Sequence, residues 1–391
     1  MSTTTDPRTA IAQLDQTALN ELLNHGKGPF VSIYMPTERR GADTRKNAIR
    51  YKDLLKQAEA ELKAGDAGAA EAMLGELHAI SDDNDFWQHQ LDGLAIFRGP
   101  ELFRIYRLGR PVPEKAAVAD SFHVKPLLRI LQSATRYQLL AVTQKHVALY
   151  EGDLDTLDEV PLHGDVPKNI IDALGGQVDG ELNVNSYGGM SYSGMFHGHH
   201  DSKDAREKDR ERYLRAVDRA VYDHHRRSSQ MPLYFAGDVD YHDTFNRVTH
   251  DPRATKKGIR INPDAAEVGP DRLRQEMESV LKPALDAEVH ELSEQFGNAK
   301  AKGQGSSDVR EVAEAALQGR VLTLLVNADM SVGGVIDPET GKAIMHDEGD
   351  PHADDLLDDL CELTMKTGGR VRVLPGDQHP TDSGVAAIYR Y

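Results

Sequence analysis

The stretch that decides the fold is residues 202–221, which read SKDAREKDRERYLRAVDRAV. Its first half is charged almost throughout and carries no large apolar side chain. The apolar residues of its second half recur at helical spacing on one face, and they are Tyr213, Val217, Ala220 and Val221. The pattern predicts a helix that is anchored at its C-terminal end and projects its charged first turns into solvent.

A long segment rich in glycine and asparagine, residues 160–202, precedes this helix. It has few periodic apolar positions, so we expect a loop. Loops of this length inside compact proteins are usually functional or disordered. The segment contains Gly175-Gly176-Gln177 and, beside the helix, the stretch FHGHH at 196–200.

Strand and helix patterns alternate on both sides of this region. GPFVSIYMP at 28–36 predicts a buried strand, and residues 44–62 predict a helix whose apolar stripe includes Ile49. Toward the C-terminus, an amphipathic pattern runs from Pro270 to about Lys302, and Pro283 should bend or interrupt it. Further strands and helices follow to the end of the chain. Such alternation is typical of α/β domains.

Length and composition limit the classes of protein. A chain of 391 residues predicts two or three domains, and 39% apolar with 28% charged residues predicts a globular protein. There is no apolar run of membrane-spanning length, no secretory signal and only one cysteine, Cys361. We therefore expect a cytoplasmic protein that lacks disulfides and engages no membrane. The glycine clusters lack the spacing of a nucleotide-binding loop, so we expect no cofactor.

The net charge of −17 argues against broad binding to nucleic acid, and we expect no DNA partner. Two segments are nevertheless basic, residues 203–227 and RATKKGIR at 253–260. These two segments are where we expect contact with RNA.

The order of motifs resembles that of the archaeo-eukaryotic peptide release factors and Pelota, and most closely the third family of their bacterial relatives. The resemblance rests on a hairpin pattern at 137–153, a long loop, and a basic helix with an RxxYxxxV signature at Arg210, Tyr213 and Val217. DVREVAEAALQGRVLTLLV at 308–326 is similar to the entry of the family's last domain.

The resemblance implies an α/β protein of three domains. They are an N-terminal α/β domain at 1–130, an RNase-H-like middle domain with the long loop and projecting helix at 131–265, and an L7Ae-like domain at 266–391. It also implies a ribosome-associated translation factor for stalled or idle ribosomes, acting in rescue or hibernation at the tRNA entry site. The implied partners are rRNA, tRNA and a translational GTPase.

Gly-Gly-Gln is the tripeptide with which release factors free a peptide from tRNA, and there it leads almost directly into the projecting helix. Here Gln177 lies 36 residues before Tyr213 and follows PKNIIDAL, a short helix pattern with Gly175 as its C-cap. We interpret the tripeptide as a helix stop and expect binding rather than hydrolysis. The alternative is a peptidyl-tRNA hydrolase that uses Gln177.

The histidines of FHGHH leave three interpretations open: metal ligands, phosphate contacts, or an exposed polar loop. With metal, the protein would be a metal-dependent hydrolase. Asp238 and Asp240 at a strand end are either catalytic carboxylates or turn residues. The candidate RNA-binding residues are His197, His199, His200, Lys203, Arg206, Arg210, Arg212, Lys256 and Lys257. The alternative for the basic helix is a solvated surface with no binding role.

Overall fold

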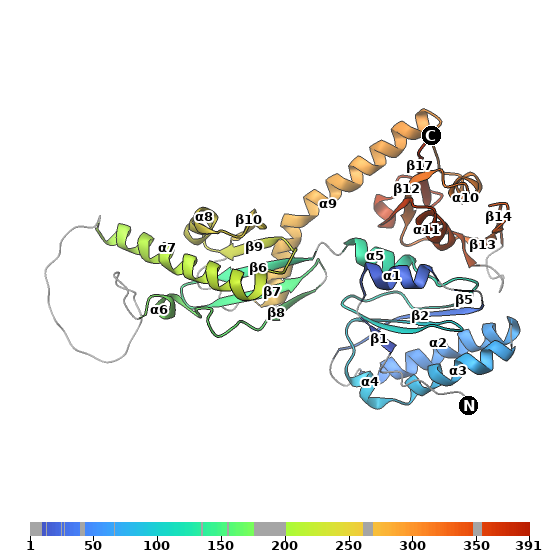
Figure 1. Cartoon of the computed structure of the whole chain (residues 1–391), viewed down its shortest axis with the longest axis horizontal. Coiled ribbons are helices and arrows are strands. Elements are labelled where there is room, and N and C mark those ends of the chain that lie inside the picture. Colours follow the sequence, from blue (N-terminus) through green and yellow to red (C-terminus); the bar gives the residue numbers. More distant parts are fainter. Residues whose placement is uncertain are drawn as a thin grey trace. The chain divides into compact units, whose positions relative to one another are not determined.

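The computed structural model describes residues 10–391 except positions 13, 25, 27, 40–43, 66, 134–135, 155, 176–200, 261–268 and 347–353. The chain is mixed α/β and divides into two compact units (Figure 1). The first unit combines Met1–Ser133 with Asp286–Tyr391, and the second is Ala134–Leu285. Among the described residues, no helix has the length and apolar character needed to cross a membrane.

The N-terminal part of the first unit is a sheet with strand order β1-β4-β3-β2-β5 between two layers of helices (Figure 1). Its strands are β1 Ile11–Ala12, β2 Phe30–Pro36, β3 Gly93–Arg98, β4 Phe103–Leu108 and β5 Lys115–Ala119. Its helices are α1 Gln16–Leu23, α2 Thr44–Gly65, α3 Ala67–Ser81, α4 Asn84–Gln88 and α5 Lys125–Ser133.

Strand β2 shows why both faces of this sheet are covered. Val31, Ile33 and Met35 pack against α2, α3 and α4, whereas Phe30 and Tyr34 pack toward α1 and α5. Successive side chains of a strand point to opposite faces, so a strand with apolar side chains on both faces needs a layer on each side. The predicted strand and the helix after it are confirmed.

Ile49 departs from the predicted stripe of α2. Its side chain is 63% exposed rather than packed on the sheet. The other predicted members of the stripe, Leu54, Leu55, Ala58 and Leu62, are buried as expected, and Tyr51 is buried with them. A position within a periodic pattern is therefore not enough to bury a residue at the edge of the packed face.

The C-terminal part of the first unit has two small sheets, ordered β11-β17-β12-β16 and β14-β13-β15. The strands are β11 Gly305–Ser306, β12 Val321–Asn327, β13 Gly333–Ile336, β14 Ala343–Met345, β15 Asp354–Asp355, β16 Arg370–Leu374 and β17 Val385–Tyr389. The helices are the part of α9 (Pro270–Ala301) from Asp286 onward, α10 Val309–Leu317 and α11 Leu356–Lys366. Helix α9 runs through Pro283, so the expected interruption is absent.

A shared core joins the two parts of the first unit. Leu127 and Leu128 of α5 belong to the same apolar cluster as Leu357 and Leu360 of α11. The carboxylate of Asp358 accepts hydrogen bonds from the backbone N–H groups that begin α5. A residue of the last third of the chain thus caps a helix of the first third, which satisfies donors that the helix itself leaves unpaired.

The second unit is a five-stranded sheet with order β10-β9-β6-β7-β8. Its strands are β6 Tyr137–Val142, β7 Val147–Gly152, β8 Leu157–Val160, β9 Leu233–Gly237 and β10 Ala254–Arg260. The helices α6 Ile170–Ala173, α7 Asp201–Val221 and α8 Val239–Val248 cover one face, and the first turns of α9 cover the other. The predicted β6–β7 hairpin and the helix at 202–221 are both confirmed.

Candidate nucleic-acid interface

Helix α7 is anchored through the apolar face of its second half. Tyr213, Leu214, Val217 and Val221 are buried in the core above β6 and β7. The Tyr213 hydroxyl donates a hydrogen bond of 2.9 Å to the carbonyl of Thr143. The predicted stripe is therefore correct, and Leu214 is the residue that it missed.

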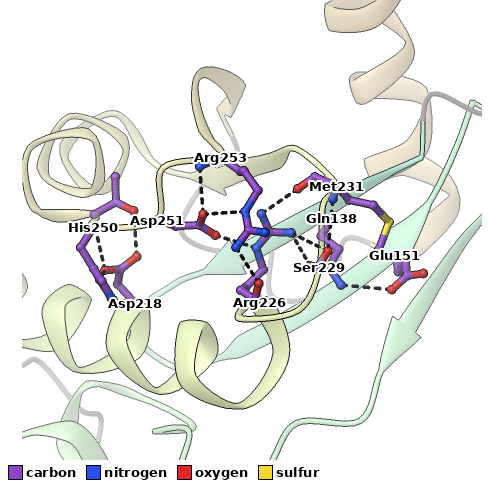
Figure 2. Close-up of polar contacts among 10 residues, drawn as sticks. Gln138, Glu151, Asp218, Arg226, Ser229, Met231, His250, Asp251 and Arg253 are labelled. Carbon is purple, nitrogen blue, oxygen red and sulfur yellow. Dashed lines mark hydrogen bonds and ion pairs between the residues drawn. The ribbon is translucent and has the colours of Figure 1, made fainter.

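The chain continues from α7 into a π-helical segment, Tyr222–Arg226, and Arg226 fixes its end (Figure 2). The guanidinium has no solvent exposure, and it donates to Asp251 at 2.7 Å, to Gln138 at 2.6 Å and to the Met231 carbonyl at 2.7 Å. Burial raises the pKa of Asp251, but hydrogen bonds from Arg226 and Arg253 outweigh this effect and hold the pKa below its ordinary value. The C-terminal end of α7 therefore rests on a buried ion pair.

Asp218 forms a second polar anchor near the same end (Figure 2). The buried carboxylate accepts from the Thr249 hydroxyl at 2.8 Å and from the backbone N–H of His250 at 3.1 Å. Both contacts join α7 to the segment that follows α8. Burying a carboxylate is unfavourable unless it is hydrogen-bonded. These contacts therefore offset the cost of burying Asp218, and they also hold the end of α7 in place.

The charged half of α7 is not wholly free in solvent. Arg210 lies 2.9 Å from the Asp240 carboxylate, donates to the Thr244 hydroxyl at 3.1 Å, and is 18% exposed. Glu207 pairs with Arg247 at 3.0 Å. The expectation that the charged first turns project into solvent is thus correct for the exposed Arg206 and Lys208 but wrong for Arg210, because α8 lies alongside α7 and its polar side chains are within reach.

These contacts also assign structural roles to the two strand-end acids. Asp238 is the N-cap of α8, and its carboxylate accepts from the backbone N–H of Tyr241 at 2.8 Å. Asp240 holds Arg210. Both carboxylates therefore position helices.

The face of α7 opposite the core carries four exposed cations, which we call the basic stripe: Lys208, Arg212, Arg215 and Arg219. Their spacing of four, three and four residues places them in one row. Glu211 pairs with Arg215 at 2.7 Å, and Arg212 lies 3.8 Å from the buried Asp209. The carboxylates of Asp204, Asp209 and Glu211 lie beside this row, so the stripe is a row of cations on a surface of mixed charge.

The structure distributes the candidate RNA-binding residues over different surfaces. Arg212 belongs to the basic stripe, whereas Arg206 is exposed on the side of the helix that carries Arg210. Lys256 and Lys257 are exposed on β10, an edge strand with a register irregularity between Ala254 and Gly258. Lysines on an edge strand commonly prevent pairing with other chains, so their exposure has a structural explanation as well.

Other candidate residues lie outside the described residues. They are Gln177, His197, His199, His200 and the side chain of Lys203. The structure does describe the start of the Gly-Gly-Gln tripeptide. Helix α6 begins at the N-cap Asn169, and Gly175 follows its C-cap with a φ of +63°. This left-handed conformation is the one that glycine adopts at a helix end, as expected.

Lys208, Arg215 and Arg219 lie within the basic segment 203–227 but are not among the RNA-binding residues predicted from the sequence. The helical period alone would have separated them from Arg206 and Arg210, which fall on the opposite side of the helix. The docking of Arg210 on α8 could not have been found in this way, because Asp240 is thirty residues away in sequence.

The comparisons with known proteins agree with this architecture at the level of the family. Residues 136–320 match the family model "Bacterial archaeo-eukaryotic release factor family 3". This segment includes helix α7 and the strands β6 to β10 of the second unit. This segment of the chain is similar to the bacterial archaeo-eukaryotic release factor family 3.

The chain is also similar, at low identity, to three solved structures. The archaeal translation termination factor aRF1 shares 14% identity over 99% of each chain, with a TM-score of 0.24. Archaeal Pelota, in a model of ribosome-bound Pelota and ABCE1, shares 12% over 97% of this chain and 95% of that one, with a TM-score of 0.37. Dom34 of S. cerevisiae, a translation termination-like factor, shares 10% over 76% and 79%, with a TM-score of 0.32. No match was found among curated protein sequences.

Proposed function

We propose that the chain is a ribosome-associated translation factor for stalled or idle ribosomes, and that the basic stripe contacts the phosphates of rRNA or tRNA. The observation that carries the proposal is the position of the stripe. It lies on a rigidly anchored helix, inside the segment that matches the release-factor-like family.

The chemistry of the stripe fits phosphate. Three of its four members are arginines, whose planar guanidinium groups can bind a phosphate through two parallel hydrogen bonds. The row extends over eleven residue steps, or roughly 16 Å along the helix axis. Since the opposite face of α7 is buried, the stripe can be presented to a partner without unfolding any part of the second unit.

The finer domain assignment belongs to the same proposal. We assign residues 131–265 to the RNase-H-like middle domain and 266–391 to the L7Ae-like domain of the family, with 1–130 as the N-terminal α/β domain. The sheet order β8-β7-β6-β9-β10, in which β7 alone runs antiparallel to the other four strands, supports an RNase-H-like arrangement.

The proposed activity is binding at the tRNA entry site, with a translational GTPase as the implied partner. Gly175 supports binding over hydrolysis because it ends a short helix, so the tripeptide has a structural explanation that requires no catalysis. Rescue and hibernation both require such binding, and peptide release from purified stalled ribosomes distinguishes a binding factor from a hydrolase.

The proposal is tested by sedimentation with purified bacterial ribosomes at low salt. The variant Lys208→Glu/Arg212→Glu/Arg215→Glu reverses three charges of the basic stripe, and we expect its affinity to fall at least about tenfold. The matched control is Lys52→Glu/Lys56→Glu/Lys63→Glu, which reverses three exposed cations of α2. Equal binding by both variants, or no binding by the wild type, would refute the proposal.

A further inference from the structure

A second feature of the second unit is a cluster of two imidazoles around one carboxylate. None of its residues belongs to the basic stripe. Oδ2 of Asp165 lies 3.4 Å from Nδ1 of His163 and 3.2 Å from Nε2 of His224. The three atoms all lie within 4.8 Å of one another. In a tetrahedral zinc site with bonds of about 2.0–2.1 Å, neighbouring ligand atoms are about 3.3 Å apart.

The backbone N–H of Asp165 contacts one imidazole of the cluster. The N–H of Asp165 points to Nδ1 of His163 at 3.3 Å, so this nitrogen acts as an acceptor and carries its lone pair. A metal ligand needs such a deprotonated nitrogen. A metal bound to Nδ1 of His163 would therefore replace this hydrogen bond.

The turn that carries His163 and Asp165 is fixed on the fold. The backbone N–H of His163 donates to Nε2 of His225 at 3.1 Å, and the N–H of Val166 donates to the His163 carbonyl at 3.0 Å. The Val166 side chain is buried in the core of the second unit. The turn is thus held from both sides, which is what a preorganised ligand site needs.

The third group, His224, comes from the π-helical segment that Arg226 terminates. Such segments occur frequently at functional sites. Because Arg226 is buried in its ion pair, the backbone beside His224 is fixed to the body of the unit. The two sequence segments that meet here are about sixty residues apart, so only the fold creates the cluster.

The orientation of the two imidazole rings determines what must change before both can bind one metal ion. The imidazoles of His163 and His224 are stacked, with centroids 3.8 Å apart and an interplanar angle of 10°. Parallel rings cannot direct both lone pairs at one ion, so one ring must turn about its Cβ–Cγ bond. The side chains are 52% and 32% exposed, which leaves room for this rotation.

We propose that His163, Asp165 and His224 form a binding site for a divalent transition metal, with Zn²⁺ as the ion that fits this set of two imidazoles and one carboxylate. Imidazole nitrogen favours zinc over the oxygen-seeking Mg²⁺ and Ca²⁺. Three protein ligands leave one tetrahedral position for water or an external anion. The bound ion would join the turn at 163–166 to the end of α7, and it would stabilise the second unit by mass action.

The test is isothermal titration calorimetry of the full chain with ZnCl₂, after treatment with a chelator and removal of any affinity tag. FHGHH at 196–200 could bind zinc on its own, so all titrations use a background variant in which His197, His199 and His200 are alanine. In this background we expect one equivalent of zinc to bind. His146→Ala, which removes an exposed imidazole elsewhere in the second unit, should leave the Kd unchanged.

His224→Ala and His163→Ala should each weaken zinc binding by more than about 100-fold. Loss of a residue that only hydrogen-bonds to a metal ligand already weakens metal binding by about 10–100-fold, and these variants remove the ligand itself. Circular dichroism establishes that both variants are folded. Absence of zinc binding in the background variant would overturn the proposal, and so would binding that survives both replacements. Neither outcome depends on whether the chain binds ribosomes.

Discussion

Replacing Arg226 by alanine tests how the second unit holds the end of α7. The guanidinium is fully buried and donates to Asp251, Gln138 and the Met231 carbonyl at 2.6–2.7 Å (Figure 2). Its removal leaves the carboxylate of Asp251 buried, with Arg253 at 3.4 Å as the remaining cation. Breaking a buried pair by removing one partner costs about 3–5 kcal/mol, and we expect a loss of this size in the free energy of unfolding of the second unit.

The assay must follow the two units separately, because a chain of several units does not unfold as one transition. Native-state hydrogen exchange in β9 and the second half of α7 reports on the second unit. The fluorescence of Trp87, the only tryptophan of the chain, reports on the first unit and should be unchanged.

The controls separate the buried ion pair from a general effect of removing arginine. Arg215→Ala removes an exposed guanidinium that pairs only with Glu211, and it should cost no more than about 0.5 kcal/mol. Arg226→Met/Asp251→Leu removes both charges and should recover much of the loss. A change below about 1 kcal/mol in Arg226→Ala, or no recovery in the double variant, would refute the role given to this pair.

Three further predictions concern a half-buried acid, a helix end and the tripeptide. Burial and the nearby carboxylates of Asp354 and Asp358 raise the pKa of Asp359 to about 10, above its ordinary value of 3.8. The first unit should therefore lose stability as the pH rises from about 4 toward 10. Asp359→Asn should raise the free energy of unfolding of this unit at pH 8 by at least about 1 kcal/mol. Urea unfolding followed by Trp87 fluorescence at pH 5 and pH 8 measures both effects, and equal pH dependence in the wild type and the variant would contradict the prediction. Gly175→Ala should destabilise the end of α6 by roughly 1 kcal/mol, seen as faster hydrogen exchange there, because φ is +63°, although no atom of the described residues obstructs the new Cβ. Gln177→Ala should leave ribosome binding and any peptide release unchanged, whereas a loss of release of about a hundredfold would identify a catalytic group.

The fold was largely predictable where a segment's own pattern determines its environment. The apolar run of β2 requires a layer on each face, and the period of α7 places Tyr213 and Val217 in the core. Gly319 and Gly368 end α10 and α11 with positive φ, as their positions after apolar helices predict. In each case the information lies within about twenty residues of sequence.

The site was less predictable because its contacts join distant segments. Arg210 looks like its basic neighbours in sequence, but the fold brings Asp240 and Thr244 to it and removes it from the free surface. His163 and His224 looked unrelated for the same reason. Two short polar stretches, LHGD at 162–165 and YDHHR at 222–226, were the only signal for that cluster.

The central claim is that α7 binds ribosomal phosphate through the basic stripe, and the salt dependence of ribosome affinity tests it most directly. Each phosphate contact contributes about −0.7 to −0.9 to the slope of log K against log salt. Four contacts predict a wild-type slope of about −3 or steeper, and Lys208→Ala/Arg212→Ala/Arg215→Ala should be shallower by about 2. Identical slopes for the two proteins, or a wild-type affinity that does not change with salt, would contradict the claim.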